Sequence, residues 1–161
     1  MNLLDKYIVF RCRQEEYAIT IDQVIAIERA EGFTSVPQLP HYVKGMIRSR
    51  GHLVPVLDIE MIFYDRAIEE SNDRRIIIIQ GEEFEYGLLV AETKEIIDIA
   101  EGLIEKPGLL LHIRLDYLKG IANFKNRLIS IIDSHRFLSS LDGNVSIAEY
   151  ITESKEAEAA L

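Results

Sequence analysis

Short apolar runs, each bounded by polar turn residues, recur along the whole chain. The turns between them are rich in charged residues, glycine and asparagine, as at Gly81-Glu82-Glu83 and Lys125-Asn126. Runs of this length that stop at turn residues are typical of β-strands rather than helices. The predicted strands include residues 7–12, 17–21, 53–57, 76–79, 86–90, 96–99 and 128–132.

The residue types in these runs support the same interpretation. Isoleucine occurs 24 times and valine 8 times, and β-branched side chains fit pleated sheets better than helices. Asp58 and Asp133 each follow a predicted strand, where an N-capping carboxylate would start a short helix. Residues 145–161 form an acidic C-terminal tail, for which a terminal helix and a frayed end both stay open. We therefore expect an all-β chain, mainly strands with short helices.

The chain contains an internal duplication. A shift of 69 residues places the strand and turn around Tyr17 on those around Tyr86, and a shift of 75 places Gly45 on Gly120. The same second shift aligns residues 53–58 with 128–133. The two offsets differ by the length of one connecting loop, where length variation is best tolerated.

This duplication predicts two similar β units of roughly five strands, covering about residues 7–58 and 76–133 of one domain at 1–144. A unit of ~70 residues is only marginally stable alone, so the two units are expected to pack or intertwine. Small antiparallel sheets often remove their exposed edges by curling into barrels. The alternative is a single sandwich whose halves resemble each other by accident.

Charge and cysteine content narrow the classes of function. Among 161 residues, 27 acidic and 18 basic side chains give a net charge of −9, which disfavours nucleic acid and anionic membranes as partners. Cys12 is the single cysteine, so no disulfide forms within the chain and an intracellular location is expected. No apolar run approaches the ~20 residues that span a bilayer, so we expect no membrane insertion.

Sequence signals for catalysis or cofactor binding are absent. The histidines are scattered and show no metal-ligand spacing; they are His41, His52, His112 and His135. No phosphate-binding loop, dinucleotide fingerprint or nucleophile elbow occurs. We therefore expect no enzyme activity, no metal and no cofactor, with a small-ligand-binding barrel as the less favoured alternative.

The segment around Arg50 has the most distinctive pattern. Gly51 after Arg50 predicts a tight turn with positive φ, which would project the arginine between two strands. Pro55 in the next strand predicts an edge position, because a central strand needs that N–H group. An arginine beside an open edge is a plausible protein-docking feature; the alternative is that Arg50 pairs with Asp58 or another acid of its own barrel.

The ordered set of these pieces resembles the CheW-like domain family over residues 6–141. The pieces in family order are Tyr17-Ala18-Ile19, Val24-Ile25-Ala26-Ile27, Pro37 to Pro40, Val43-Lys44-Gly45, Arg50-Gly51, Val54-Pro55-Val56-Leu57-Asp58, Gly87-Leu88-Leu89-Val90, Pro107, Tyr117-Leu118-Lys119-Gly120 and residues 128–133. The resemblance implies two intertwined five-stranded β-barrels, with structural turns at Gly45, Gly51 and Gly120.

The resemblance also implies a function. Family members are non-enzymatic adaptors that couple the cytoplasmic tips of methyl-accepting chemoreceptors to the regulatory domain of a CheA-type histidine kinase. By position, Arg50 and Ala26 correspond to the family's kinase-facing surface. The family's apolar receptor groove corresponds to Ile8, Ile21, Val24, Ile27 and Val90. The adaptor is expected in the cytoplasm, recruited to membrane-associated receptor arrays.

Three positions depart from the family pattern. Arg48 replaces a usual asparagine, Ala26 a common glutamate and Ala91 a usual aspartate. The first two lie in or near the implied kinase-facing surface. They keep a second interpretation open, namely a divergent adaptor of a chemosensory pathway that does not control flagella.

Overall fold

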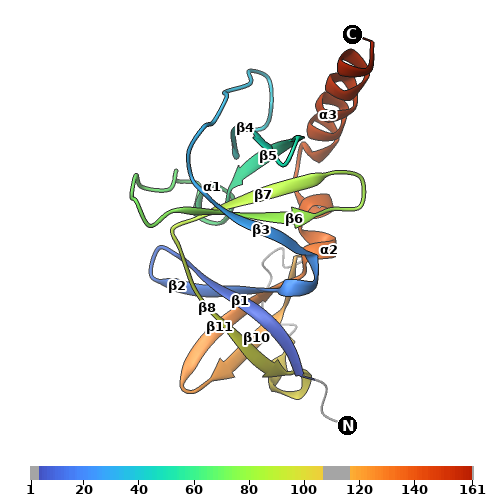
Figure 1. Cartoon of the computed structure of the whole chain (residues 1–161). Helices are drawn as coiled ribbons and strands as arrows, with labels where there is room; N and C mark the ends of the chain where they lie inside the picture. Colours follow the sequence, from blue (N-terminus) through green and yellow to red (C-terminus); the bar gives the residue numbers. More distant parts are fainter. Residues whose placement is uncertain (1–3, 107–116, 161) are drawn as a thin grey trace.

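The computed structural model describes residues 4–106 and 117–160, so Pro107 and His112 lie outside the described residues. The chain is mostly β, as the sequence predicts, and forms two sheets (Figure 1). In spatial order, the first sheet contains β8 (Glu92–Ala100), β1 (Leu4–Cys12), β2 (Glu15–Thr20), β11 (Arg127–Ile132), β10 (Leu118–Phe124) and β9 (Ile104–Glu105). The second contains β3 (Val24–Arg29), β6 (Arg75–Gln80), β7 (Glu85–Val90), β5 (His52–Asp58) and β4 (Val43–Ser49).

Short helices follow several strands. They are η1 (Ile21–Gln23), α1 (Ile59–Tyr64), η2 (Glu101–Leu103), α2 (Ser134–Phe137) and η3 (Leu138–Ser140), and the longer α3 (Asn144–Ala159) ends the chain. Asp58 accepts hydrogen bonds of 3.0 Å from two backbone N–H groups of α1. Asp133 does the same at 3.0 and 3.3 Å for α2. Both predicted N-caps are therefore confirmed.

The two halves of the sequence exchange strands. The first sheet combines β1 and β2 with strands of the second half, and the second sheet combines β6 and β7 with β3, β4 and β5. Two pairs of parallel strands join the halves: Ala18 pairs with Ile131, and Val56 pairs with Gly87. The first offset relates Ala18 to Gly87 and the second relates Val56 to Ile131, so the two pairs are equivalent under the duplication. The duplication and the intertwining are confirmed, and the single-sandwich alternative is wrong.

Each sheet closes on itself through the segment that follows an edge strand. Thr34, beyond β3, exchanges two backbone hydrogen bonds of 2.7 and 2.8 Å with Met46 of β4. Glu105, beyond β8, pairs with Ile121 of β10 at the position related by duplication. This second segment is regular enough to count as a strand, so one barrel has six strands where five are expected.

Three apolar cores explain why the strand runs are continuous rather than alternating. Along β1, Tyr7 and Val9 pack into the core of the first sheet, whereas Ile8 and Phe10 point into a larger core shared by both halves. Strands that are buried on both faces read as unbroken apolar runs. The shared core makes the two halves one folding unit.

The two duplicated glycines lie in strands rather than in turns. Gly45 lies in β4 and Gly120 in β10, each beside a register shift. A Cβ on Gly45 would lie 2.7 Å from the carbonyl oxygen of Thr34, and one on Gly120 would lie 2.5 Å from that of Glu105. Their role is therefore to allow the closing segment to approach. Gly51 does occupy a turn, with φ of 79°.

Pro55 does not mark an edge. It lies in β5, between β7 and β4, and is buried. Its partner Met46 uses its own N–H and C=O to bond Thr34, so Met46 and Pro55 form a non-hydrogen-bonded pair. The proline nitrogen therefore faces β7, where the described parallel ladder includes Val56 but not Pro55. The edge prediction is wrong because an interior strand tolerates proline where no ladder bond is needed.

The C-terminal tail forms a helix, α3, which projects from the barrels (Figure 1). Ile147 and Ile151 are buried in the shared core, and the hydroxyl of Tyr42 donates a 2.6 Å hydrogen bond to the carbonyl oxygen of Asp142 just before the helix. Among the described helices, none combines the length and the apolar composition needed to cross a bilayer.

Candidate functional site

The hairpin between β4 and β5 holds Arg50 in a fixed backbone geometry. Arg50 and Gly51 have φ values of 52° and 79°, and Ser49 pairs with His52, which is the pattern of a two-residue type I′ turn. The hairpin related to it by duplication also has positive φ at both turn residues, 49° at Lys125 and 66° at Asn126. The duplication thus preserves the turn geometry although the residue types differ.

Arg50 forms an ion pair with Glu85, the first residue of β7. The distance from Nη2 of Arg50 to Oε1 of Glu85 is 2.5 Å. The Glu85 side chain is 10% exposed and its other oxygen is buried without a hydrogen-bond partner, whereas the Arg50 side chain stays 44% exposed. Arg50 therefore pairs with an acid of its own barrel, as the alternative interpretation of the sequence expects, and this acid is Glu85 and not Asp58.

A similar ion pair occurs on the opposite sheet, although the second offset relates its arginine, Arg127, to His52 and not to Arg50. Glu16, which the first offset places on Glu85, accepts hydrogen bonds of 3.0 and 2.7 Å from Arg127. Lys94 approaches the same carboxylate at 3.2 Å. The hydrogen bonds from Arg127 lower the pKa of Glu16 below its usual value, although partial burial opposes the shift. Both acids thus bind an arginine from the other half of the sequence.

The strand that carries Ala26 meets the Arg50 hairpin where the second sheet closes. The hydroxyl of Ser49 donates a 2.5 Å hydrogen bond to Glu28 of β3. Ala26 lies two residues before Glu28 on this edge strand and is half-buried, opposite Ile78 at a register shift. Ser49, the neighbour of Arg50, therefore joins the hairpin to the Ala26 strand at this seam, although β3 and β4 lie at opposite ends of the sheet order.

The five residues of the predicted receptor groove separate into two sets. Ile8 and Val90 are buried in the shared core. Ile21 and Val24 pack against that core and stay half-buried, and Ile27 is 43% exposed on β3. Ile8 and Val90 can therefore support a docking surface only from beneath, and the accessible part consists of the other three.

Sequence reasoning missed a second exposed isoleucine. Ile96 on β8 is 60% exposed and is related to Ile27 by the first offset. Each lies on an edge strand of its sheet. The offset that relates the two halves could have indicated this pair, because both positions lie in matching strands.

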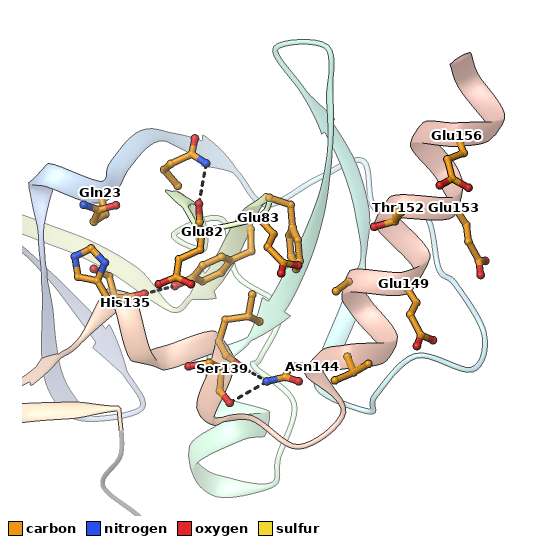
Figure 2. A pocket seen from close by; sticks show the side chains of 18 residues that line it. Gln23, Glu82, Glu83, His135, Ser139, Asn144, Glu149, Thr152, Glu153 and Glu156 are labelled. Carbon is orange, nitrogen blue, oxygen red and sulfur yellow. Dashed lines mark hydrogen bonds between the residues drawn. The ribbon is translucent and has the colours of Figure 1, made fainter. Parts of the chain in front are cut away.

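A groove outside these predicted surfaces lies between the β6–β7 turn and α3. Its volume is about 740 Å³, and α2 and η3 close one side. Figure 2 shows Glu82 and Glu83 on the turn facing the helix that carries Glu149 and Glu153. No local sequence pattern marks this groove, because it forms only when the tail folds back beside the second sheet.

Two departures from the family pattern have clear structural settings. Arg48 on β4 forms an ion pair with Glu158 near the end of α3. Ala91 is buried, and its N–H donates a 3.1 Å hydrogen bond to the carbonyl oxygen of Arg11. Arg48 therefore contacts the C-terminal helix, whereas Ala91 lies at the junction between β7 and β8.

Metal-ligating and nucleophilic groups do not converge in the described parts of the chain. No cluster of three or more histidine, cysteine or acidic side chains suited to a metal occurs within residues 4–106 and 117–160. Cys12 is buried, and desolvation raises the pKa of its thiol well above the usual value. A thiol in this state is a packed apolar group rather than a nucleophile.

Comparison with known proteins gives consistent results. The family model of the CheW-like domain matches residues 6–142. The chain is 34% identical to the chemotaxis protein CheW of Bacillus subtilis, over 83% of this chain and 86% of that protein, and 28% identical to CheW of Helicobacter pylori, over 79% and 77%. The crystal structure of the scaffolding protein TtCheW from Thermoanaerobacter tengcongensis superposes with a TM-score of 0.78 at 31% identity, covering 89% of this chain and 92% of that one.

Proposed function

The chain belongs to the CheW-like domain family, and we propose that it is a non-enzymatic adaptor that couples chemoreceptors to a CheA-type histidine kinase. Both partners are inferred from the family. An adaptor needs two docking surfaces, and both are proposed on the second sheet, one at the Arg50 hairpin and one along η1 and the start of β3. The cytoplasm, where receptor tips and kinase meet, is the proposed location.

The kinase surface is proposed at the closing seam of the second sheet. The observation that carries this proposal is the half-exposed guanidinium of Arg50, which Glu85 holds at the tip of a rigid hairpin. Within the described part of the chain, Arg50 donates to Glu85 through Nη2 alone, so its other N–H groups can donate to a carboxylate or carbonyl on a partner barrel. Ala26 lies beside this seam and offers little side chain, so shape rather than charge would define its contact.

The receptor surface is proposed along η1 and the start of β3. Ile21, Val24 and Ile27 form its accessible apolar part, and a receptor helix would bury them. Ile8 and Val90 lie in the core beneath and fix the shape of this surface. Replacing either of them would therefore change stability before it changed binding.

The contact between Arg48 and Glu158 favours a variant of this function. It ties the end of α3 to β4, the strand that leads into the Arg50 hairpin. A kinase that docks on this hairpin must accommodate the helix. A divergent adaptor, matched to its own kinase and not to a flagellar one, is therefore the second candidate.

Co-purification tests the proposal directly. The full chain should retain the regulatory domain of the CheA-type kinase encoded in the same genome, and a receptor-tip fragment should bind at the same time. Ile27→Asp, on the exposed part of β3, should weaken receptor capture and leave kinase capture intact. Failure to bind either partner, with the protein folded by circular dichroism, would refute the adaptor function.

A further inference from the structure

The groove between the β6–β7 turn and α3 has an apolar floor. Phe84 and Tyr86 of the hairpin, Leu138 of η3 and Ala148 of α3 contribute to this floor. The hydroxyl of Tyr86 donates a 3.1 Å hydrogen bond to the carbonyl oxygen of Ser134, so the largest polar group in the floor is already paired. Val145, at the start of α3, lines the groove and is 63% exposed. Such a floor favours apolar side chains over a polar small molecule.

Acidic side chains border this floor on two sides. Glu82 and Glu83 come from the turn, and Glu149, Glu153 and Glu156 come from α3 (Figure 2). No ion pair links any of the five to a cationic side chain of the described chain. Among the described residues that line the groove, His135 is the only basic one. The groove is therefore apolar at its floor and negative at its rim.

The acidic face of α3 carries a conformational cost in the free protein. Glu149 and Glu153 are four positions apart, and like charges at this spacing repel each other on a helix surface. The face that bears them is separate from the face that carries Ile147 and Ile151 into the core. A cationic partner would remove this repulsion and gain attraction to both sides of the groove.

We propose that this groove binds a basic amphipathic helix of a partner protein. The apolar stripe of such a helix would contact Phe84, Leu138 and Val145, and its flanking lysine or arginine side chains would pair with the glutamates on both sides. Gln23, the last residue of η1, lines the groove, so the groove adjoins the proposed receptor surface, but Ile21, Val24, Ile27, Ala26 and Arg50 do not line it. It is thus a third docking surface, and it does not depend on the identity of the other two partners.

The test uses the full chain and a synthetic peptide of about 18 residues in which leucine and lysine repeat at helical spacing. Fluorescence anisotropy should show binding in roughly the micromolar range, and the same peptide with glutamate in place of lysine should not bind. Amide resonances of residues 82–84 and 145–156 should shift on titration. Because the probe contains neither kinase nor receptor, its result is independent of the proposed adaptor function.

Charge reversal separates a specific groove from general attraction to an acidic protein. Glu149→Lys with Glu153→Lys should weaken binding at least about 10-fold. Val145→Asp should weaken it to a similar extent, because it places a charge on the apolar floor of the groove. The matched control is Glu69→Lys with Asp73→Lys, an equal charge change at exposed positions outside the groove, which should weaken binding less than about 3-fold. Equal loss in both double variants, shifts confined to other surfaces, or no binding by the natural chain would overturn the proposal.

Discussion

Arg50, at the tip of the β4–β5 hairpin, donates a hydrogen bond to Glu85 at the start of β7, and this contact joins the two halves of the duplicated sequence. A similar pair, Arg127 with Glu16, joins them again on the other sheet, where Lys125 is the residue related to Arg50. Each pair lies where a hairpin of one half runs alongside a strand of the other. The two pairs therefore contribute to the pairing of the exchanged strands as well as to the surface.

The first prediction concerns the Arg50 pair. Arg50→Glu should lower the free energy of unfolding by roughly 1–3 kcal/mol, because it places a second carboxylate beside one that is already largely buried. Urea denaturation measures this change. Adding Glu85→Arg to the same chain should recover most of the loss, since the opposite charges are restored. An unchanged midpoint in Arg50→Glu would contradict the structural role.

A second prediction follows from the lowered pKa of Glu16. A carboxyl group whose folded pKa lies below its ordinary value of 4.5 stabilises the fold above that value, and the contribution is lost as the pH falls through the folded pKa. The natural chain should therefore lose more stability than Glu16→Gln between about pH 6 and pH 3. The exposed Glu83→Gln variant is the control and should keep the natural slope. Parallel slopes for the natural chain and Glu16→Gln would refute this coupling.

The third prediction concerns Gly120. A methyl group there would meet the carbonyl oxygen of Glu105 at 2.5 Å and the side chain of Ile104 at 2.6 Å, so Gly120→Ala should cost about 1–3 kcal/mol. Gly102→Ala is the matched control, because nothing lies within 4 Å of its added Cβ, and it should change stability by less than about 0.5 kcal/mol. Thermal melts of the two variants distinguish them. Equal melting temperatures would show that barrel closure does not require the glycine.

The fourth prediction separates the two attachments of α3. Ile147 is fully buried, so Ile147→Ala should lower the free energy of unfolding by about 2–5 kcal/mol. Arg48 and Glu158 are both largely exposed, so Arg48→Ala should cost less than about 1 kcal/mol. Denaturant titration measures both. A larger loss for Arg48→Ala would mean that the ion pair, and not the apolar face, holds the helix.

Local features of the sequence predicted the elements well. The apolar runs mark most of the strands, and Asp58 and Asp133 mark the helix starts, because strands and caps depend on neighbouring residues. The offsets also placed Gly45 and Gly120 at equivalent points. These features require no knowledge of how distant segments meet.

Features that depend on pairing between distant strands were not predicted. Pro55 was expected at an edge, since the order of strands across the sheet cannot be read from the run itself. Glu85 was not identified as the partner of Arg50, because parallel contact between β5 and β7 brings together residues far apart in sequence. The groove beside α3 was missed for the same reason, as it forms only when the tail packs against both halves.

Titration calorimetry of the kinase regulatory domain against three chains tests the central claim most directly. The chains are the natural protein, Arg50→Glu, and Arg50→Glu with Glu85→Arg. The adaptor account predicts that Arg50→Glu weakens binding roughly 5- to 150-fold and that the double variant regains stability but not binding, because the guanidinium has left the hairpin. If the double variant binds as tightly as the natural chain, or if the natural chain does not bind, Arg50 is structural only and the proposed kinase surface is wrong.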